Sequence, residues 1–150
     1  MKMIKGGICA AKGFKASGIH CGIRKNRTKA DLALIYSETL CSGAAVYTTN
    51  KVYGAPIKVD RRHLANGTAQ AIICNSGNAN TCAPGGEQLA LDTCALVARE
   101  LGIPTQDVLV CSTGVIGQAM ELAPFEKACP WQYRPWPKAR RLPPLRPLPL

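Results

Sequence analysis

Aromatic side chains and long apolar runs are both scarce in this sequence of 150 residues. Phe, Trp and Tyr make up 5% of the chain, whereas apolar residues as a whole make up 47%. A hydrophobic core must therefore be built largely from Ala, Val, Ile and Leu, and the length suits one domain. No stretch approaches the roughly 20 apolar residues of a transmembrane helix, and the first residues lack the apolar segment of a secretory signal. These absences predict a cytoplasmic protein with no membrane partner.

The spacing typical of zinc sites is also missing, although cysteine itself is abundant. The eight cysteines include no Cys-x-x-Cys pair, and His20 and His63 each stand alone. Both features argue against a structural zinc site, so no metal ligand is predicted. An even number of cysteines would suit a disulfide framework, but buried or half-buried, reduced thiols in the cytosol are the favoured interpretation. The cysteines are Cys9, Cys21, Cys41, Cys74, Cys82, Cys94, Cys111 and Cys129.

Acidic residues are absent from the last part of the chain, 129–150, which holds seven of the 11 prolines and both tryptophans. The net charge of +10 is therefore divided equally between this short segment and residues 1–128. Such a charge could indicate nucleic acid, but its uneven distribution argues against that partner for the folded part. We expect 1–128 to be one domain and 129–150 a disordered, non-native Pro/Arg-rich tail that arose by frameshift or truncation. A lineage-specific Pro-rich linker is the alternative.

The first 128 residues predict a mixed α/β fold. Residues 69–75 form a continuous apolar run, which is typical of a strand buried on both faces. Residues 86–101 carry a helical apolar stripe, and Gly102 and Pro104 supply the expected stop signal. The other predicted strands are 31–37, 44–49, 55–60 and 107–111.

Two polar segments, 75–80 and 112–117, follow predicted strands and could carry chemistry. Thr113 and Gly114 could provide a hydroxyl and a backbone N–H to a developing oxyanion. The structural alternatives are an ordinary turn for 75–80, and a strand-to-helix turn in which Ser112 or Thr113 caps the helix. Nucleophile-elbow and phosphate-loop patterns are missing. The adjacent His20 and Cys21 would point to opposite faces of a strand, and 61–63 suggests a solvated basic turn after a strand.

Taken in order, several segments resemble the ornithine acetyltransferase family, which makes N-acetylglutamate in arginine biosynthesis. Two of them are Asn-Ser-Gly-Asn-Ala-Asn-Thr-Cys at 75–82 and Ser-Thr-Gly-Val-Ile-Gly at 112–117. The others lie at 6–8, 12–18, 22–24, 29–34, 46–50 and 55–56. Each segment alone is a weak signal, but their order and spacing make the resemblance specific.

The resemblance implies a layered αββα-type sandwich, here incomplete, and a precursor that cleaves itself before a threonine. That threonine would take the acetyl group from N-acetylornithine, or in some members from acetyl-CoA, and pass it to glutamate. In the family Thr113 and Gly114 would form the oxyanion hole, and no metal or organic cofactor would take part. The family also implies a heterotetramer of two α and two β chains, the β chain coming from the same precursor.

Three family features are missing from this sequence: an Ala-Thr-Met motif with the nucleophile, a substrate-binding Thr-Thr-Asp segment and a binding lysine. The chain therefore matches the N-terminal part of the α chain and is expected to be inactive alone, because no nucleophile is present. Two alternatives remain open. One is a binding module whose basic Pro-rich tail recruits a partner, and the other is a pseudo-enzyme that regulates a full-length relative.

Overall fold

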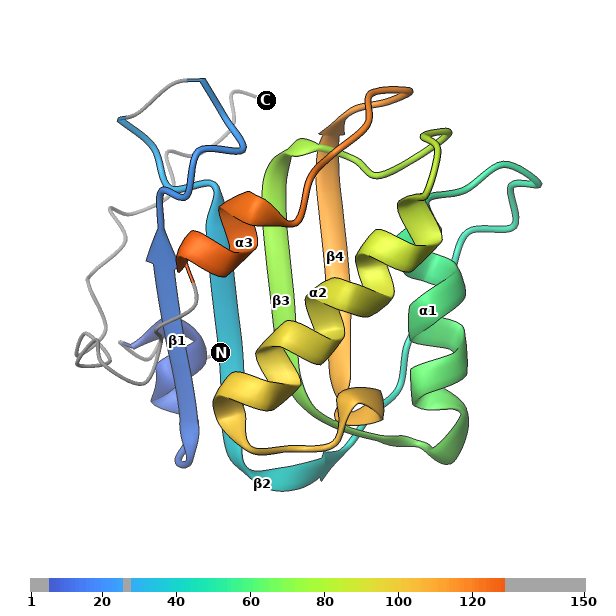
Figure 1. Cartoon of the computed structure of the whole chain (residues 1–150). Helices are drawn as coiled ribbons and strands as arrows, with labels where there is room; N and C mark the ends of the chain where they lie inside the picture. The colour runs from blue at the N-terminus through green and yellow to red at the C-terminus, as the bar shows by residue number, and fades with distance from the viewer. Residues whose placement is uncertain (1–5, 26–27, 129–150) are drawn as a thin grey trace, which may run out of the picture.

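A computed structural model describes residues 6–25 and 28–128 (Figure 1). The strands are β1 (Phe14–Ile19), β2 (Leu32–Ser42), β3 (Thr68–Asn78) and β4 (Val108–Val115). The α-helices are α1 (Ala55–His63), α2 (Gly86–Leu101) and α3 (Ala123–Ala128), and short 3-10 helices are η1 (Gly7–Ala10), η2 (Leu64–Asn66) and η3 (Thr105–Asp107). The expected tail, 129–150, lies outside the described residues.

The four strands form one mixed sheet in the order β1-β2-β3-β4. Strands β1, β2 and β3 are antiparallel neighbours, whereas β3 and β4 are parallel because α2 crosses over between them. The α-helices lie on one face of this sheet (Figure 1). The α/β fold expected from the sequence is confirmed, with one sheet and one helical layer among the described residues.

The core lies between the sheet and the helices. Alternate residues of the strands, such as Leu32 and Leu34 in the inner strand β2 and Val108 and Val110 in the edge strand β4, are at most 3% exposed. They meet the apolar stripe of α2, which includes Cys94 and Val97. The residues between them in sequence face the other side of the sheet, as the period of two along a strand requires.

The predicted helix 86–101 is confirmed, and strands are found where 31–37, 69–75 and 107–111 predicted them. The predicted strand 44–49 is wrong, because that segment has no regular structure. The predicted strand 55–60 is also wrong, because it belongs to α1. Pro56 occupies the first helical turn, where proline is tolerated, and Val59 is buried one turn later.

The basic segment 61–63 is the last turn of α1 and not a turn after a strand. His63 is buried there, and its Nδ1 lies 2.7 Å from the Val108 carbonyl oxygen. The guanidinium of Arg61 lies 5.1 Å from the ring centroids of both Tyr47 and Tyr53, which holds the irregular segment before α1 against this helix. The sequence also gave no prediction of β1 or α3, which are short and lack a clear apolar period.

Candidate functional site

The two polar segments singled out in the sequence lie side by side at the ends of β3 and β4. They are not loops, since β3 continues to Asn78 and β4 to Val115. Ser76 pairs with Thr113, and Gly77 pairs with Gly114. The register of the two strands then shifts at Asn78, which is paired with both Thr113 and Val115. Such an irregularity bends a strand and changes where its groups point, and irregularities of this kind are common next to functional sites.

Gly77 and Gly114 meet at a backbone contact that no other residue could make. The φ angle is +112° at Gly77 and +136° at Gly114, a region that side chains rarely allow. A Cβ atom on Gly114 would lie 2.3 Å from the carbonyl carbon of Gly77. A Cβ atom on Gly77 would lie 2.7 Å from Cγ of Arg24. The shape of this junction therefore depends on both glycines.

The asparagines of 75–80 are buried and serve mainly to hold the surrounding backbone. Asn78 donates from Nδ2 to the Gln118 carbonyl at 2.9 Å, and its Oδ1 accepts the Asn80 N–H at 2.8 Å. Asn80 donates to the Gly86 carbonyl at 2.7 Å, next to the start of α2. Asn75 donates to the Asn78 carbonyl at 2.9 Å. These bonds fix the strand ends around the glycine junction, and the turn interpretation of 75–80 is replaced by a bulged strand end.

Thr113 is exposed, and no hydrogen bond to its hydroxyl is found within 6–25 and 28–128. Neither Ser112 nor Thr113 caps a helix, because both lie within β4 and the next helix, α3, begins at Ala123. The strand-to-helix alternative is therefore wrong. Behind Thr113, Ser112 pairs in register with Asn75, and Ser112 Oγ and Asn75 Oδ1 are buried without a partner among the described residues.

An open cleft of about 1040 Å³ lies against this junction. Both strand ends line it, together with the loop that follows β1 and the segment that follows β4. Arg24 and Lys25 contribute positive charge to its wall, and Glu121 contributes negative charge. Thr113 and Gly114 thus face a volume large enough for a small molecule, with polar and charged groups around it.

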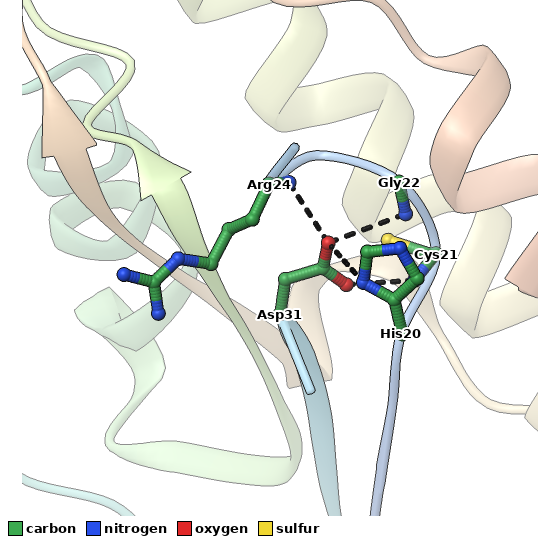
Figure 2. Close-up of polar contacts among 5 residues, drawn as sticks. All are labelled: His20, Cys21, Gly22, Arg24 and Asp31. Carbon is green, nitrogen blue, oxygen red and sulfur yellow. Dashed lines mark hydrogen bonds and ion pairs between the residues drawn. The ribbon is translucent and has the colours of Figure 1, made fainter. Parts of the chain in front are cut away.

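The loop that follows β1 is held by the carboxylate of Asp31 (Figure 2). Oδ1 accepts the Cys21 N–H at 2.7 Å, and Oδ2 accepts the N–H groups of Gly22 at 3.2 Å and Arg24 at 2.9 Å. His20 Nδ1 lies 3.1 Å from Oδ2. The Arg24 side chain extends away from Asp31 (Figure 2), and its stem covers Gly77. Asp31 therefore fixes one wall of the cleft.

The main chain of Asp31 joins this loop to the strand that carries Gly77. Its carbonyl accepts the Ser76 N–H at 2.8 Å, and its N–H donates to the Ile19 carbonyl at 2.9 Å. Burial alone would raise the pKa of Asp31, but the N–H donors of Arg24 and Cys21 and the neighbouring His20 hold it below its ordinary value. The carboxylate is consequently charged over the physiological pH range.

His20 and Cys21 do not form a nucleophile pair. The imidazole of His20 faces Asp31, whereas Cys21 is engaged there through its backbone N–H. Burial raises the pKa of the Cys21 thiol to about 12, so the reactive thiolate is rare at neutral pH. The role of Asp31 could not be predicted, because no local sequence pattern shows which backbone groups a carboxylate will reach.

Among residues 6–25 and 28–128, no group of three or more His, Cys, Asp or Glu side chains is arranged to hold a metal ion. Within the same residues, no helix is long and apolar enough to cross a bilayer.

Comparison with known sequences identifies the relatives of this chain. A sequence model of the ArgJ family matches residues 15–139, a range that continues past residue 128. The chain is 49% identical over 130 residues to the arginine biosynthesis bifunctional protein ArgJ of Caldanaerobacter subterraneus, covering 85% of this chain and 30% of that protein. It is 50% identical over 126 residues to the Gloeobacter violaceus protein of the same name, covering 83% and 30%. The chain thus spans about 30% of the length of these relatives.

Solved structures give the same result for the fold. The arginine biosynthesis bifunctional protein ArgJ of Bacillus halodurans superposes with a TM-score of 0.76 at 41% identity, covering 81% of this chain and 63% of that one. Ornithine acetyltransferase of Mycobacterium tuberculosis, solved in complex with ornithine, superposes with a TM-score of 0.75 at 34% identity, covering 81% and 66%. The described sheet and helices therefore correspond to part of a larger domain.

Proposed function

Because this chain belongs to the ArgJ family, we propose that it supplies the oxyanion-binding part of an acetyltransferase site that makes N-acetylglutamate in arginine biosynthesis. The observation that carries the proposal is the junction of Gly77 and Gly114, which places Thr113 and Gly114 against the cleft. An exposed hydroxyl beside a backbone segment of this shape can direct two donors at one oxygen atom. The reaction would take place in the cytoplasm.

The chemistry would proceed in two acyl-transfer steps. A threonine hydroxyl from a complementary β chain would attack the acetyl carbonyl of N-acetylornithine, and its proton would pass to the departing ornithine amine. The amine of glutamate would then attack the acetyl-threonine ester and restore the hydroxyl. In both steps negative charge develops on the carbonyl oxygen, which Thr113 Oγ1 and the Gly114 N–H would stabilise. Acetyl-CoA is a second candidate donor for the first step.

The assembly we propose contains two α and two β chains, with this chain forming most of an α chain. The ornithine complex of the Mycobacterium tuberculosis relative supports the substrate class, since ornithine is the product of the first step. The chain as given contains no Ala-Thr-Met motif, so we expect the 150 residues alone to show no acetyl transfer. Transfer from N-acetylornithine to glutamate by the pure chain would contradict this part of the proposal.

The oxyanion assignment is tested in a hybrid enzyme that joins residues 1–128 to the remainder of the Caldanaerobacter relative. Thr113→Val removes the hydroxyl but keeps the shape, and we expect turnover to fall by about a hundredfold. Thr105→Val, in η3 at the other end of β4, is the matched control and should leave turnover unchanged. If Thr113→Val retains activity within a few-fold of the parent while self-cleavage is intact, Thr113 is not an oxyanion donor.

A further inference from the structure

Asp31 is bonded to the backbone on both sides of Gly77. It directly precedes β2 and is 2% exposed. Its carboxylate accepts three N–H groups of the loop that follows β1, and its carbonyl oxygen accepts the Ser76 N–H at 2.8 Å. One buried residue therefore fixes both this loop and the position directly before Gly77 in β3. Every partner in this arrangement belongs to the described residues of the chain.

The loop that Asp31 holds lies so close to Gly77 that a side chain would not fit there. A Cβ atom on Gly77 would lie 2.7 Å from Cγ of Arg24 and 3.2 Å from Cγ2 of Ile23. Asp31 Oδ2 accepts the Arg24 N–H at 2.9 Å, which fixes the backbone from which the Arg24 stem extends. A change in the Asp31 carboxylate is therefore transmitted to Gly77 through this stem.

On its other side, Gly77 contacts the strand that carries the candidate oxyanion donors. A Cβ atom on Gly114 would clash with the Gly77 carbonyl group and lie 2.5 Å from the backbone nitrogen of Asn78. Directly after Asn78, the Ala79 N–H donates to the Val115 carbonyl at 2.9 Å and joins the two strands again. Because packing at such a contact leaves no free space, Gly77 cannot shift without moving Gly114.

We propose that Asp31 is a positioning residue for the oxyanion donors Thr113 and Gly114, acting through the loop 21–24 and Gly77. The inference rests on the proposed function, to which it adds a residue that touches neither the substrate nor the reacting atoms. A displacement of about 1 Å in a catalytic group can lower a rate by about a hundredfold. Loosening the contact at Gly77 therefore lowers kcat, whereas binding of the ground-state substrate, and with it KM, changes little.

The first measurement needs no catalytic activity and uses the 150-residue chain. Amide hydrogen exchange of the Ala79 N–H, followed by NMR, reports how often the junction opens. Asp31→Asn keeps the shape of the side chain but replaces an acceptor oxygen with an NH2 group, and we expect Ala79 to exchange at least about tenfold faster. Val97→Ala, which opens a cavity in the core beneath the second half of α2, is the control for lost stability. It should change the exchange of Ala79 by less than about threefold.

A matched pair of variants tests the step through the loop, and it applies even if Asp31→Asn does not fold. Arg24→Ala removes the stem that covers Gly77 and should also speed the exchange of Ala79. Arg24→Met keeps a stem of similar shape without the charge and should leave that exchange unchanged. The inference is overturned if Arg24→Ala has no effect, or if Val97→Ala speeds the exchange of Ala79 as much as Asp31→Asn does.

The second measurement uses the hybrid enzyme that joins residues 1–128 to the remainder of the Caldanaerobacter relative. We expect Asp31→Asn to lower kcat by at least about tenfold and to change KM for N-acetylornithine by less than about threefold. In the Thr113→Val background the same substitution should lower kcat less, because one of the positioned donors is already missing. His20→Gln, which leaves the three N–H bonds of Asp31 in place, is the control and should keep kcat within about twofold.

The kinetic results separate this inference from the proposed function. A fall in kcat that is equally large with and without the Thr113 hydroxyl overturns the positioning role, and so does a rise in KM at constant kcat. An inactive parent hybrid would count against the proposed function alone. In that case the exchange of Ala79 still decides whether Asp31 holds the junction.

Discussion

Asp31 and Asp60 both accept backbone hydrogen bonds from partly or fully buried positions, yet their pKa values shift in opposite directions. Asp31 accepts N–H groups from three residues of one loop and lies beside His20, and its pKa is lowered. Asp60, on α1, accepts one hydrogen bond from the described residues, from the Val110 N–H at 2.9 Å, and burial raises its pKa to about 6. Burial opposes the charge in both cases, but only at Asp31 do the N–H donors and the neighbouring His20 together outweigh it.

The difference separates two roles for a carboxylate in this fold. Asp31 organises a wall of the cleft around a charge that is fully compensated, so the loop is held firmly over Gly77. Asp60 holds the first half of the edge strand β4, together with His63, and its charge is poorly compensated. Ionisation of Asp31 therefore stabilises the folded chain, whereas ionisation of Asp60 destabilises it.

The largest effect is expected for Asp31→Ala, which would leave three backbone N–H groups without their acceptor. We expect a loss of about 3 kcal/mol of unfolding free energy, measured by urea titration at pH 7. Asp92→Ala is the control, because it removes a carboxylate that accepts only an exposed Gln88 side chain, and it should cost well under 1 kcal/mol. Equal losses in the two variants would show that Asp31 is no more than an ordinary surface acceptor.

We expect Asp60→Asn to increase the free energy of unfolding, and only at pH values above those at which Asp60 ionises in the folded chain. A raised pKa means that the contribution of Asp60 is fully present below its unfolded pKa near 4 and is lost as the pH rises through about 6. Because Asp60 is partly exposed, the variant should be more stable by only about 1 kcal/mol at pH 8 and indistinguishable from the parent at pH 4. Thermal unfolding of both proteins between pH 4 and pH 8 measures this difference in stability. A variant that is less stable than the parent at pH 8 would contradict the prediction.

The smallest effect is expected for His20→Gln. The imidazole lies beside a carboxylate that already has three N–H donors, and its side chain is 28% exposed. We expect a loss of about 0.5 kcal/mol at pH 7 in the same urea titration. A loss as large as that of Asp31→Ala would mean that the imidazole, and not the backbone donors, compensates the Asp31 charge.

The sequence predicted the parts of this fold that local rules determine. The helix 86–101 has a clear apolar stripe and a Gly102 stop, and the structure reproduces both ends. Residues 55–60 were predicted as a strand because six residues are too few to distinguish the period of a strand from that of a helix. Pro56 did not decide between them, because proline is also tolerated in the first turn of a helix. The helix allows Val59 to pack in the core, where it is fully buried.

In the candidate site, too, some features follow from local sequence and others depend on the fold. Thr113 and Gly114 were selected from the sequence because a hydroxyl and a glycine N–H after an apolar strand could bind an oxyanion, and their assignment as oxyanion donors stays a prediction. The contact of Gly114 with Gly77, and the loop that Asp31 holds, depend on which strands become neighbours. Local sequence carries no information about that choice, so neither could be predicted without the fold.

The crossover through α2 has a consequence for how the site assembles during folding. Neighbouring strands β1 and β2 are joined by the short connection 20–31, whereas β4 reaches β3 only through the connection 79–107, the longest between neighbouring strands, which contains α2. Closing such a long connection costs entropy before any contact repays it, which makes parallel pairing slow. We therefore expect the junction at Gly77 and Gly114 to form only after this connection has closed, and a chain caught before that step would have β1, β2 and β3 paired but would lack the Thr113–Gly114 segment beside Gly77.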